Sequence, residues 1–266
     1  MARIIVVILC LLASGIMAFP TAPMSAEEPV SNGQVRRFKI DSRTVVGDRV
    51  VKNVTIFYDG LVYDFIGEHG QITIYDKTAG TFTLLDPSSR LKTQVTVQEL
   101  TDHFATCKES LRKSDNPLHN YLAEPYFEEN SYEAESGLMY FRSPWIEYRF
   151  ETVVLGDPVV SELYYDYCTQ STLLNIRTSG VPTTMIRYVL NPIIEKNQRF
   201  PGKVHMTFYP KGKVLLARTV IEAESTHTFV RRLQSTDEAK IKQQAKRHLE
   251  LFRQVPLDEY LRTVSE

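Results

Sequence analysis

The chain has 266 residues, of which 31 are Lys or Arg and 32 are Asp or Glu, so its formal net charge is −1. This near balance argues against nucleic acid or an anionic membrane surface as the main partner. The residues that follow the N-terminal segment are enough for one large domain that buries roughly 70–75% of its unfolded surface, or for two small ones. One domain is preferred, because no stretch after Gln34 has the length and composition of a linker.

The N-terminal segment has the pattern of a secretory signal peptide. Arg3 is followed by an uninterrupted apolar run from Ile4 to Leu12, and small residues suited to cleavage stand at Ala18 and Ala26. The run is too short for a comfortable membrane span of about 20 residues. We therefore predict export to the periplasm or the cell exterior. The predicted organisation is a signal peptide at 1–26, a flexible leader at 27–33 and a single domain at 34–266.

After a first strand within residues 34–44, a β-meander is predicted from Val50 to Thr96. There, β-branched and aromatic residues alternate with polar ones between turns that contain glycine. Asp59-Gly60 is typical of a two-residue hairpin turn, because both turn positions need positive φ and Gly accepts it without steric cost. Pairing across this turn sets Tyr58 against Leu61, which fixes the register of the first hairpin.

The same pairing rule predicts one continuous apolar face across the meander. The second hairpin should place Phe65 opposite Ile72. The third should place Phe82 opposite Ile74 and Leu84 opposite Ile72. This face is the candidate ligand-binding surface, and its members are Val54, Ile56, Tyr58, Tyr63, Phe65, Ile72, Ile74, Phe82 and Leu84.

Apolar residues that recur every three to four positions predict four helices. Asp157 is a suitable N-cap before Pro158, and Ser235 with Glu238 matches a capping box. The helices cover 97–114, 157–178, 182–197 and a final segment from Ser235. The third helix should bury a stripe made of Met185, Ile186, Val189, Leu190, Ile193 and Ile194.

These elements predict an α+β fold with a large, curved, antiparallel sheet that resembles a half-barrel, and with about four helices packed on its apolar face. The helices beginning at Val97, Asp157 and Pro182 are the candidates to cover that face. Further strands are predicted at 138–142, 145–155, 203–209 and 213–222, and Pro256–Val264 is predicted as a short trailing segment.

Removal of the signal peptide leaves two cysteines, Cys107 and Cys168, in a compartment where disulfides persist. Both fall on or beside the apolar stripes of predicted helices. A bridge between them would pin the two helices and contribute roughly 4 kcal/mol in the chain-entropy model. The alternative is two separate buried thiols that act as small apolar residues.

No sequence motif of catalysis or cofactor binding is present. The chain has no Gly-x-Ser-x-Gly elbow and no glycine-rich phosphate loop. Glu99, His103 and Cys107 share one helix face, but a structural zinc site normally needs four ligands. We therefore predict no catalytic residue, no metal site and no cofactor. Acidic pairs at 128–129 and at 222 and 224 leave a glycan hydrolase as the third functional hypothesis.

The meander has the phrases Tyr58-Asp59-Gly60-Leu61-Val62-Tyr63 and Tyr75-Asp76-Lys77-Thr78, and helices follow it. Together with the signal peptide, this pattern of strands and turn motifs over residues 34–111 resembles the lipoprotein-carrier and lipoprotein-localisation superfamily of bacterial envelopes. The resemblance implies a curved antiparallel sheet whose concave apolar face is plugged by helices and holds acyl chains.

The leading functional hypothesis is a non-catalytic exported protein that binds a hydrophobic or lipid-like ligand between sheet and helices. The expected partner is a lipid or an acylated molecule, with no nucleic acid and with at most transient contact with a membrane. An envelope scaffold or protein-interaction domain with a fully packed core is the alternative. The two hypotheses differ in whether a continuous apolar cavity remains between the sheet and the helices.

Overall fold

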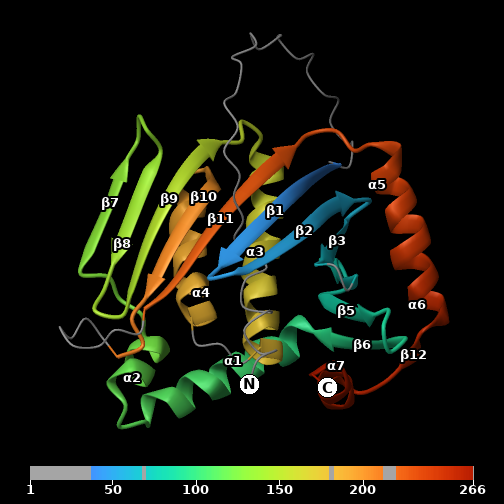
Figure 1. Cartoon of the computed structure of the whole chain (residues 1–266), viewed down its shortest axis with the longest axis horizontal. Coiled ribbons are helices and arrows are strands. Elements are labelled where there is room, and N and C mark those ends of the chain that lie inside the picture. The colour runs from blue at the N-terminus through green and yellow to red at the C-terminus, as the bar shows by residue number, and fades with distance from the viewer. Residues whose placement is uncertain (1–36, 68–69, 180–182, 212–219, 266) are drawn as a thin grey trace.

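The computed structural model describes residues 37–67, 70–179, 183–211 and 220–265, and the predicted signal peptide and leader lie outside these ranges. The described strands form one open sheet of twelve strands (Figure 1). Its order is β12-β6-β5-β4-β3-β2-β1-β11-β10-β9-β8-β7, and only the short β12–β6 pair is parallel. The strands are β1 (Phe38–Val46), β2 (Arg49–Tyr58), β3 (Leu61–Ile66), β4 (Gln71–Asp76), β5 (Thr81–Asp86), β6 (Leu91–Thr96), β7 (Glu129–Glu133), β8 (Leu138–Arg142), β9 (Ile146–Val154), β10 (Arg199–Phe208), β11 (Ile221–Val230) and β12 (Arg253–Gln254).

The helices pack on both faces of this sheet. They are α1 (Val97–Arg112), α2 (Pro117–Ala123), α3 (Pro158–Ser179), α4 (Thr183–Lys196), α5 (Ser235–Lys240), the π-helix η2 (Ile241–Lys246), α6 (Arg247–Leu251) and α7 (Leu257–Ser265). Because α5, η2 and α6 follow one another without a break, they form one continuous helical segment. None of the described helices combines the length and apolar composition that crossing a lipid bilayer requires.

The predicted half-barrel with about four helices on a single face is therefore wrong, although the structure is consistent with the α+β class. The sheet is much larger than predicted, because strands from both halves of the chain join it through the β1–β11 pair. We call the face that packs against α3 and α4 the inner face, and the face that packs against α5, η2 and α6 the outer face.

The first two hairpins of the meander have the predicted register. Tyr58 pairs with Leu61 across a turn in which Asp59 and Gly60 both have positive φ, of 52° and 79°. In the next hairpin Phe65 pairs with Ile72. Both pairs place their side chains on the outer face, as the alternation of the strands requires.

The predicted register of the third hairpin is wrong by one residue. Ile72 pairs with Leu85, and Tyr75 pairs with Phe82. Since a one-residue shift moves every side chain to the opposite face of a sheet, Phe82 and Leu84 point to the inner face and Leu85 takes the outer position. The single apolar face that the sequence predicted is therefore divided between the two sides.

The helices that cover the predicted face also differ from expectation. The outer-face cluster of Ile56, Tyr63, Phe65, Ile72, Ile74 and Leu85 is closed by Ile241, Ala245 and Phe252 of the C-terminal segment. Figure 1 shows this segment running beside the β2–β5 part of the sheet. Helix α3 packs on the inner face instead, where Tyr167 contacts the rings of Phe57 and Tyr75.

Three local predictions need correction. Helix α5 begins one residue earlier than its predicted capping box, since Gln234 is the N-cap and the Asp237 carboxylate accepts from its backbone N–H. The trailing segment forms α7. The strand predicted at 213–222 falls mostly outside the described residues, and β11 begins at Ile221.

Candidate functional site

The inner face of the sheet carries a row of polar side chains in its middle. Thr55 pairs with Asp64 across β2 and β3, and Asp64 pairs with Thr73 across β3 and β4. All three are buried. On the next row, Ser42 of β1 and His227 of β11 are also buried and hydrogen-bonded. A face that only filled a core would favour apolar residues at these positions.

Asp64 is a buried carboxyl group with its own set of donors. Its side chain is 5% exposed and accepts hydrogen bonds from Thr55 Oγ1 at 2.7 Å, from Asn53 Nδ2 at 3.3 Å and from the Tyr167 hydroxyl. Burial raises the pKa of Asp64, and these hydrogen bonds only partly oppose the effect. The three donors hold the carboxyl group in a fixed position at the contact between sheet and α3.

Arg187 of α4 is the second charged group of the interior. The residue is only 8% exposed, and its Nε and Nη1 atoms are buried without a hydrogen-bond acceptor. Its guanidinium lies over the ring of Phe150 on β9, 5.3 Å from the ring centroid. No carboxylate of the described residues forms an ion pair with it. The effective penalty for burying such a charge is on the order of several kcal/mol, which a cation–π contact of roughly 2 kcal/mol offsets only in part.

The surroundings of Arg187 are aromatic and polar together. Burial raises the pKa values of Tyr148 and Tyr164, and the positive charge of Arg187 opposes both shifts. Burial also raises the pKa of the Cys168 thiol to about 12, again against the influence of Arg187. One helical turn after Arg187, the fully buried Asn191 donates to Thr172 Oγ1, while its Oδ1 has no partner.

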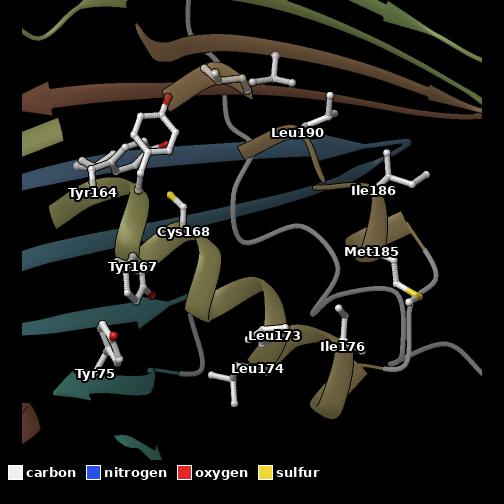
Figure 2. Packing of buried hydrophobic residues seen from close by; sticks show 14 of the residues in the cluster. Tyr75, Tyr164, Tyr167, Cys168, Leu173, Leu174, Ile176, Met185, Ile186 and Leu190 are labelled. Atoms are coloured by element: carbon white, nitrogen blue, oxygen red, sulfur yellow. The ribbon is translucent and has the colours of Figure 1, made fainter. Parts of the chain in front are cut away.

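We call Arg187, Asn191, Tyr148, Phe150, Tyr164 and Cys168 the Arg187 site. They come from β9, α3 and α4, and Figure 2 shows Tyr164 and Cys168 on α3 within the same buried cluster as Ile186 and Leu190 on α4. The site joins a large aromatic surface to buried hydrogen-bonding atoms that other protein groups do not satisfy. Such a combination suits recognition of a molecule with a polar head and an apolar body.

The nine residues predicted as a ligand-binding surface do not all lie on one face of the sheet. Seven lie on the outer face under the C-terminal helical segment, where Val54 and Tyr58 are partly buried at the rim. Phe82 and Leu84 belong to the inner-face core. None of the nine belongs to the Arg187 site.

The two cysteines are free thiols in the structure, which is the second of the two alternatives drawn from the sequence. Cys168 is buried in the Arg187 site. Cys107 is half-buried on α1, with its sulfur 3.3 Å from His103 Nε2. Glu99 does not join them, because its carboxylate accepts from the backbone N–H and hydroxyl of Thr96 in the capping box of α1.

Candidate residues for a hydrolase lie in two places in the structure. Ser42 Oγ lies 3.0 Å from His227 Nδ1, and both side chains are buried on the inner face. Of the acidic candidates, Glu129 pairs with Arg142, and Glu224 pairs with Lys203 and His205. These pairs are typical of solvated strand surfaces.

Arg187 was not predicted from the sequence, because the buried face of this helix was assigned from its apolar residues alone. In the structure α4 is rotated so that Arg187 and Asn191 are buried, while Val189 is half-buried and Ile193 is exposed. The available signal was the spacing of Arg187 and Asn191. They lie four residues apart and flank Leu190 on the apolar side of the helix.

A comparison with models of known protein families found no family that matches this chain, and no curated protein matched its sequence significantly.

Proposed function

We propose that the protein is an exported, non-catalytic binding protein that holds an amphipathic, lipid-like ligand between the inner face of the sheet and helices α3 and α4. The observation that supports this function is the set of partnerless polar atoms inside the Arg187 site, namely Arg187 Nε and Nη1 and Asn191 Oδ1. Buried polar groups without partners cost stability and are rare in cores that serve packing alone.

The aromatic residues around these atoms supply the apolar part of the binding surface. Tyr148 and Phe150 stack with ring centroids 5.5 Å apart, and Tyr164 packs against Phe200 at 5.0 Å. Rings of this kind offer large apolar area to an alkyl chain, and the tyrosine hydroxyls add hydrogen-bonding capacity. The ligand class is the one that the resemblance of residues 34–111 implies, while the proposed site lies on the inner face of the sheet.

Binding can be followed through the single tryptophan of the chain. Trp145 stands immediately before β9 and packs against the core that contains Tyr148 and Phe150. Titration of the purified mature protein with hexadecanol and with hexadecanoate should change the Trp145 fluorescence saturably. Native mass spectrometry of the same sample should detect a bound amphiphile.

Two variants of α4 test where the amphiphile binds. Asn191→Leu replaces a buried amide with an apolar side chain, so we expect weaker binding and a folded protein of equal or greater stability. Lys196→Leu changes an exposed residue of the same helix and should bind as the unmodified protein does. Absence of binding to either amphiphile would favour the scaffold hypothesis, in which the interior is only a core.

A further inference from the structure

The charge of Arg187 bears on the kind of headgroup that the ligand carries. The guanidinium is held inside the protein by α4 and faces the β9 ring of Phe150. Two of its three nitrogens are buried and have no acceptor. A guanidinium in water would have its donors satisfied, so this position favours any ligand that brings acceptor oxygens to it.

The acidic residues of the interior do not supply those oxygens. Of the buried carboxyl groups on this face, Asp64 accepts from Thr55, Asn53 and Tyr167, and Asp86 accepts from Ser88 and Ser89. Glu195, on the same helix as Arg187, is exposed. The groups on which Arg187 acts electrostatically are Tyr148, Tyr164, Tyr165 and Cys168, which are neutral at physiological pH.

We propose that Arg187 is the receptor for an acidic headgroup, a carboxylate or a phosphate monoester, on a ligand whose apolar chain packs against the aromatic residues of the inner face. This inference rests on the proposed function and adds the class of the ligand. The planar guanidinium presents a fork of N–H donors that matches two oxygens of a carboxylate or phosphate. A cationic headgroup would be repelled, and a neutral alcohol would leave part of the fork without an acceptor.

Asn191, one helical turn after Arg187, offers a second contact to the headgroup. Its side chain lies on the same face of α4 as Arg187, and its Oδ1 accepts from no protein group. A hydroxyl on the headgroup, such as that of a phosphate monoanion, would donate to this oxygen. Hexadecyl phosphate is therefore expected to bind at least as tightly as hexadecanoate.

The test compares three amphiphiles with the same chain and different heads. Hexadecanoate, hexadecyl phosphate and hexadecanol are titrated at neutral pH into the unmodified protein, Arg187→Met and Arg187→Lys, with Trp145 fluorescence as the readout. Inorganic phosphate alone, added as a competitor, distinguishes a headgroup receptor from a free-anion site. Arg142→Met, which removes an exposed arginine that pairs with Glu129, is the matched control.

We expect the unmodified protein and Arg142→Met to bind the two acidic amphiphiles about tenfold or more tightly than the alcohol. Arg187→Met should lose this preference while its affinity for hexadecanol is retained, and Arg187→Lys should keep part of it. Equal binding of all three heads by the unmodified protein, or a preference that persists in Arg187→Met, overturns the headgroup assignment and leaves the proposed function intact. If no amphiphile binds, the proposed function itself is overturned.

Discussion

The two faces of the sheet differ in what they bury. The outer face of β2 to β5 is closed by the C-terminal helical segment. Beside its apolar cluster, the buried Asp237 carboxylate of this segment forms an ion pair with Lys39 of β1, and the Lys240 ammonium lies over the Phe65 ring. The inner face contains a large apolar core as well, but it also buries Asp64, His227 and, from α4, Arg187. Both faces are covered by helices, so coverage alone does not distinguish them. The difference is that the buried Asp237 has an ion-pair partner, whereas Arg187 forms no ion pair with a carboxylate of the described residues.

Apolar burial and buried charge have opposite effects on the stability of the folded protein. Apolar burial stabilises the folded state by roughly 25 cal/mol per Å², whereas buried charges reduce that gain unless they are well paired. The outer face buries Asp237 as well, but the ion pair of Asp237 with Lys39 offsets part of that cost. The inner face tolerates Arg187 without an ion pair, which a purely structural interface would have little reason to retain.

The largest expected effect comes from placing a charge in the outer-face cluster. Tyr63→Asp or Phe65→Asp would bury a carboxylate among Ile56, Ile72 and Ile241, at a cost of about 4–5 kcal/mol or more, so we expect loss of folding. Circular dichroism and thermal melting would measure it. Val50→Asp on the same β2–β3 hairpin is the control, because Val50 is 48% exposed. Folded Tyr63→Asp protein would show that this face is not core.

A moderate effect is expected from the helical segment that closes this face. Ile241→Ala removes a fully buried side chain at the start of η2 and should lower the free energy of unfolding by about 2–4 kcal/mol. Chemical denaturation would measure the change, with the exposed neighbour variant Lys242→Ala as control. The folded Ile241→Ala protein should bind amphiphiles with unchanged affinity. A large loss of affinity would place the ligand on the outer face instead.

The sequence predicted the strands of the meander well because hairpin register is a local property. The Asp59-Gly60 turn alone fixes the pairing of Tyr58 with Leu61, and the alternation of side chains then assigns their face. The sequence determines the register of the third hairpin less well. In β5 the apolar residues Leu84 and Leu85 stand side by side, so either could continue the outer face, and the sequence does not choose between them.

Non-local pairing could not be predicted from sequence pattern. The β1–β11 pair joins Ile40 to Phe229, far apart in the chain, and it is this pair that merges two sets of strands into one sheet. For the same reason the sequence predicted the helix from Ser235 but not the face that it covers. The Arg187 site depends on the packing of β9, α3 and α4, so its members carry no shared local motif.

The smallest expected effect concerns the charge of Asp64 and has a defined pH dependence. Because burial raises its pKa in the folded state, folding favours the protonated form, and stability is lost as the pH rises from the ordinary value of 3.8 through the raised pKa. Asp64→Asn removes this loss. We expect the variant to match the unmodified protein at acidic pH and to be more stable by on the order of 1 kcal/mol at neutral pH.

Asp86→Asn should change the stability of the protein in the opposite direction to Asp64→Asn. Burial alone would raise the pKa of Asp86, but hydrogen bonds from Ser89 and Ser88 outweigh it and lower the pKa. A lowered pKa contributes stability above 3.8 that disappears as the pH falls through the folded-state value. Asp86→Asn should therefore be less stable than the unmodified protein at neutral pH, with the difference vanishing in acid. Denaturation curves of both variants across this pH range test the assignment, because differences of the same sign would show that Asp64 is stabilised as a carboxylate by its three donors.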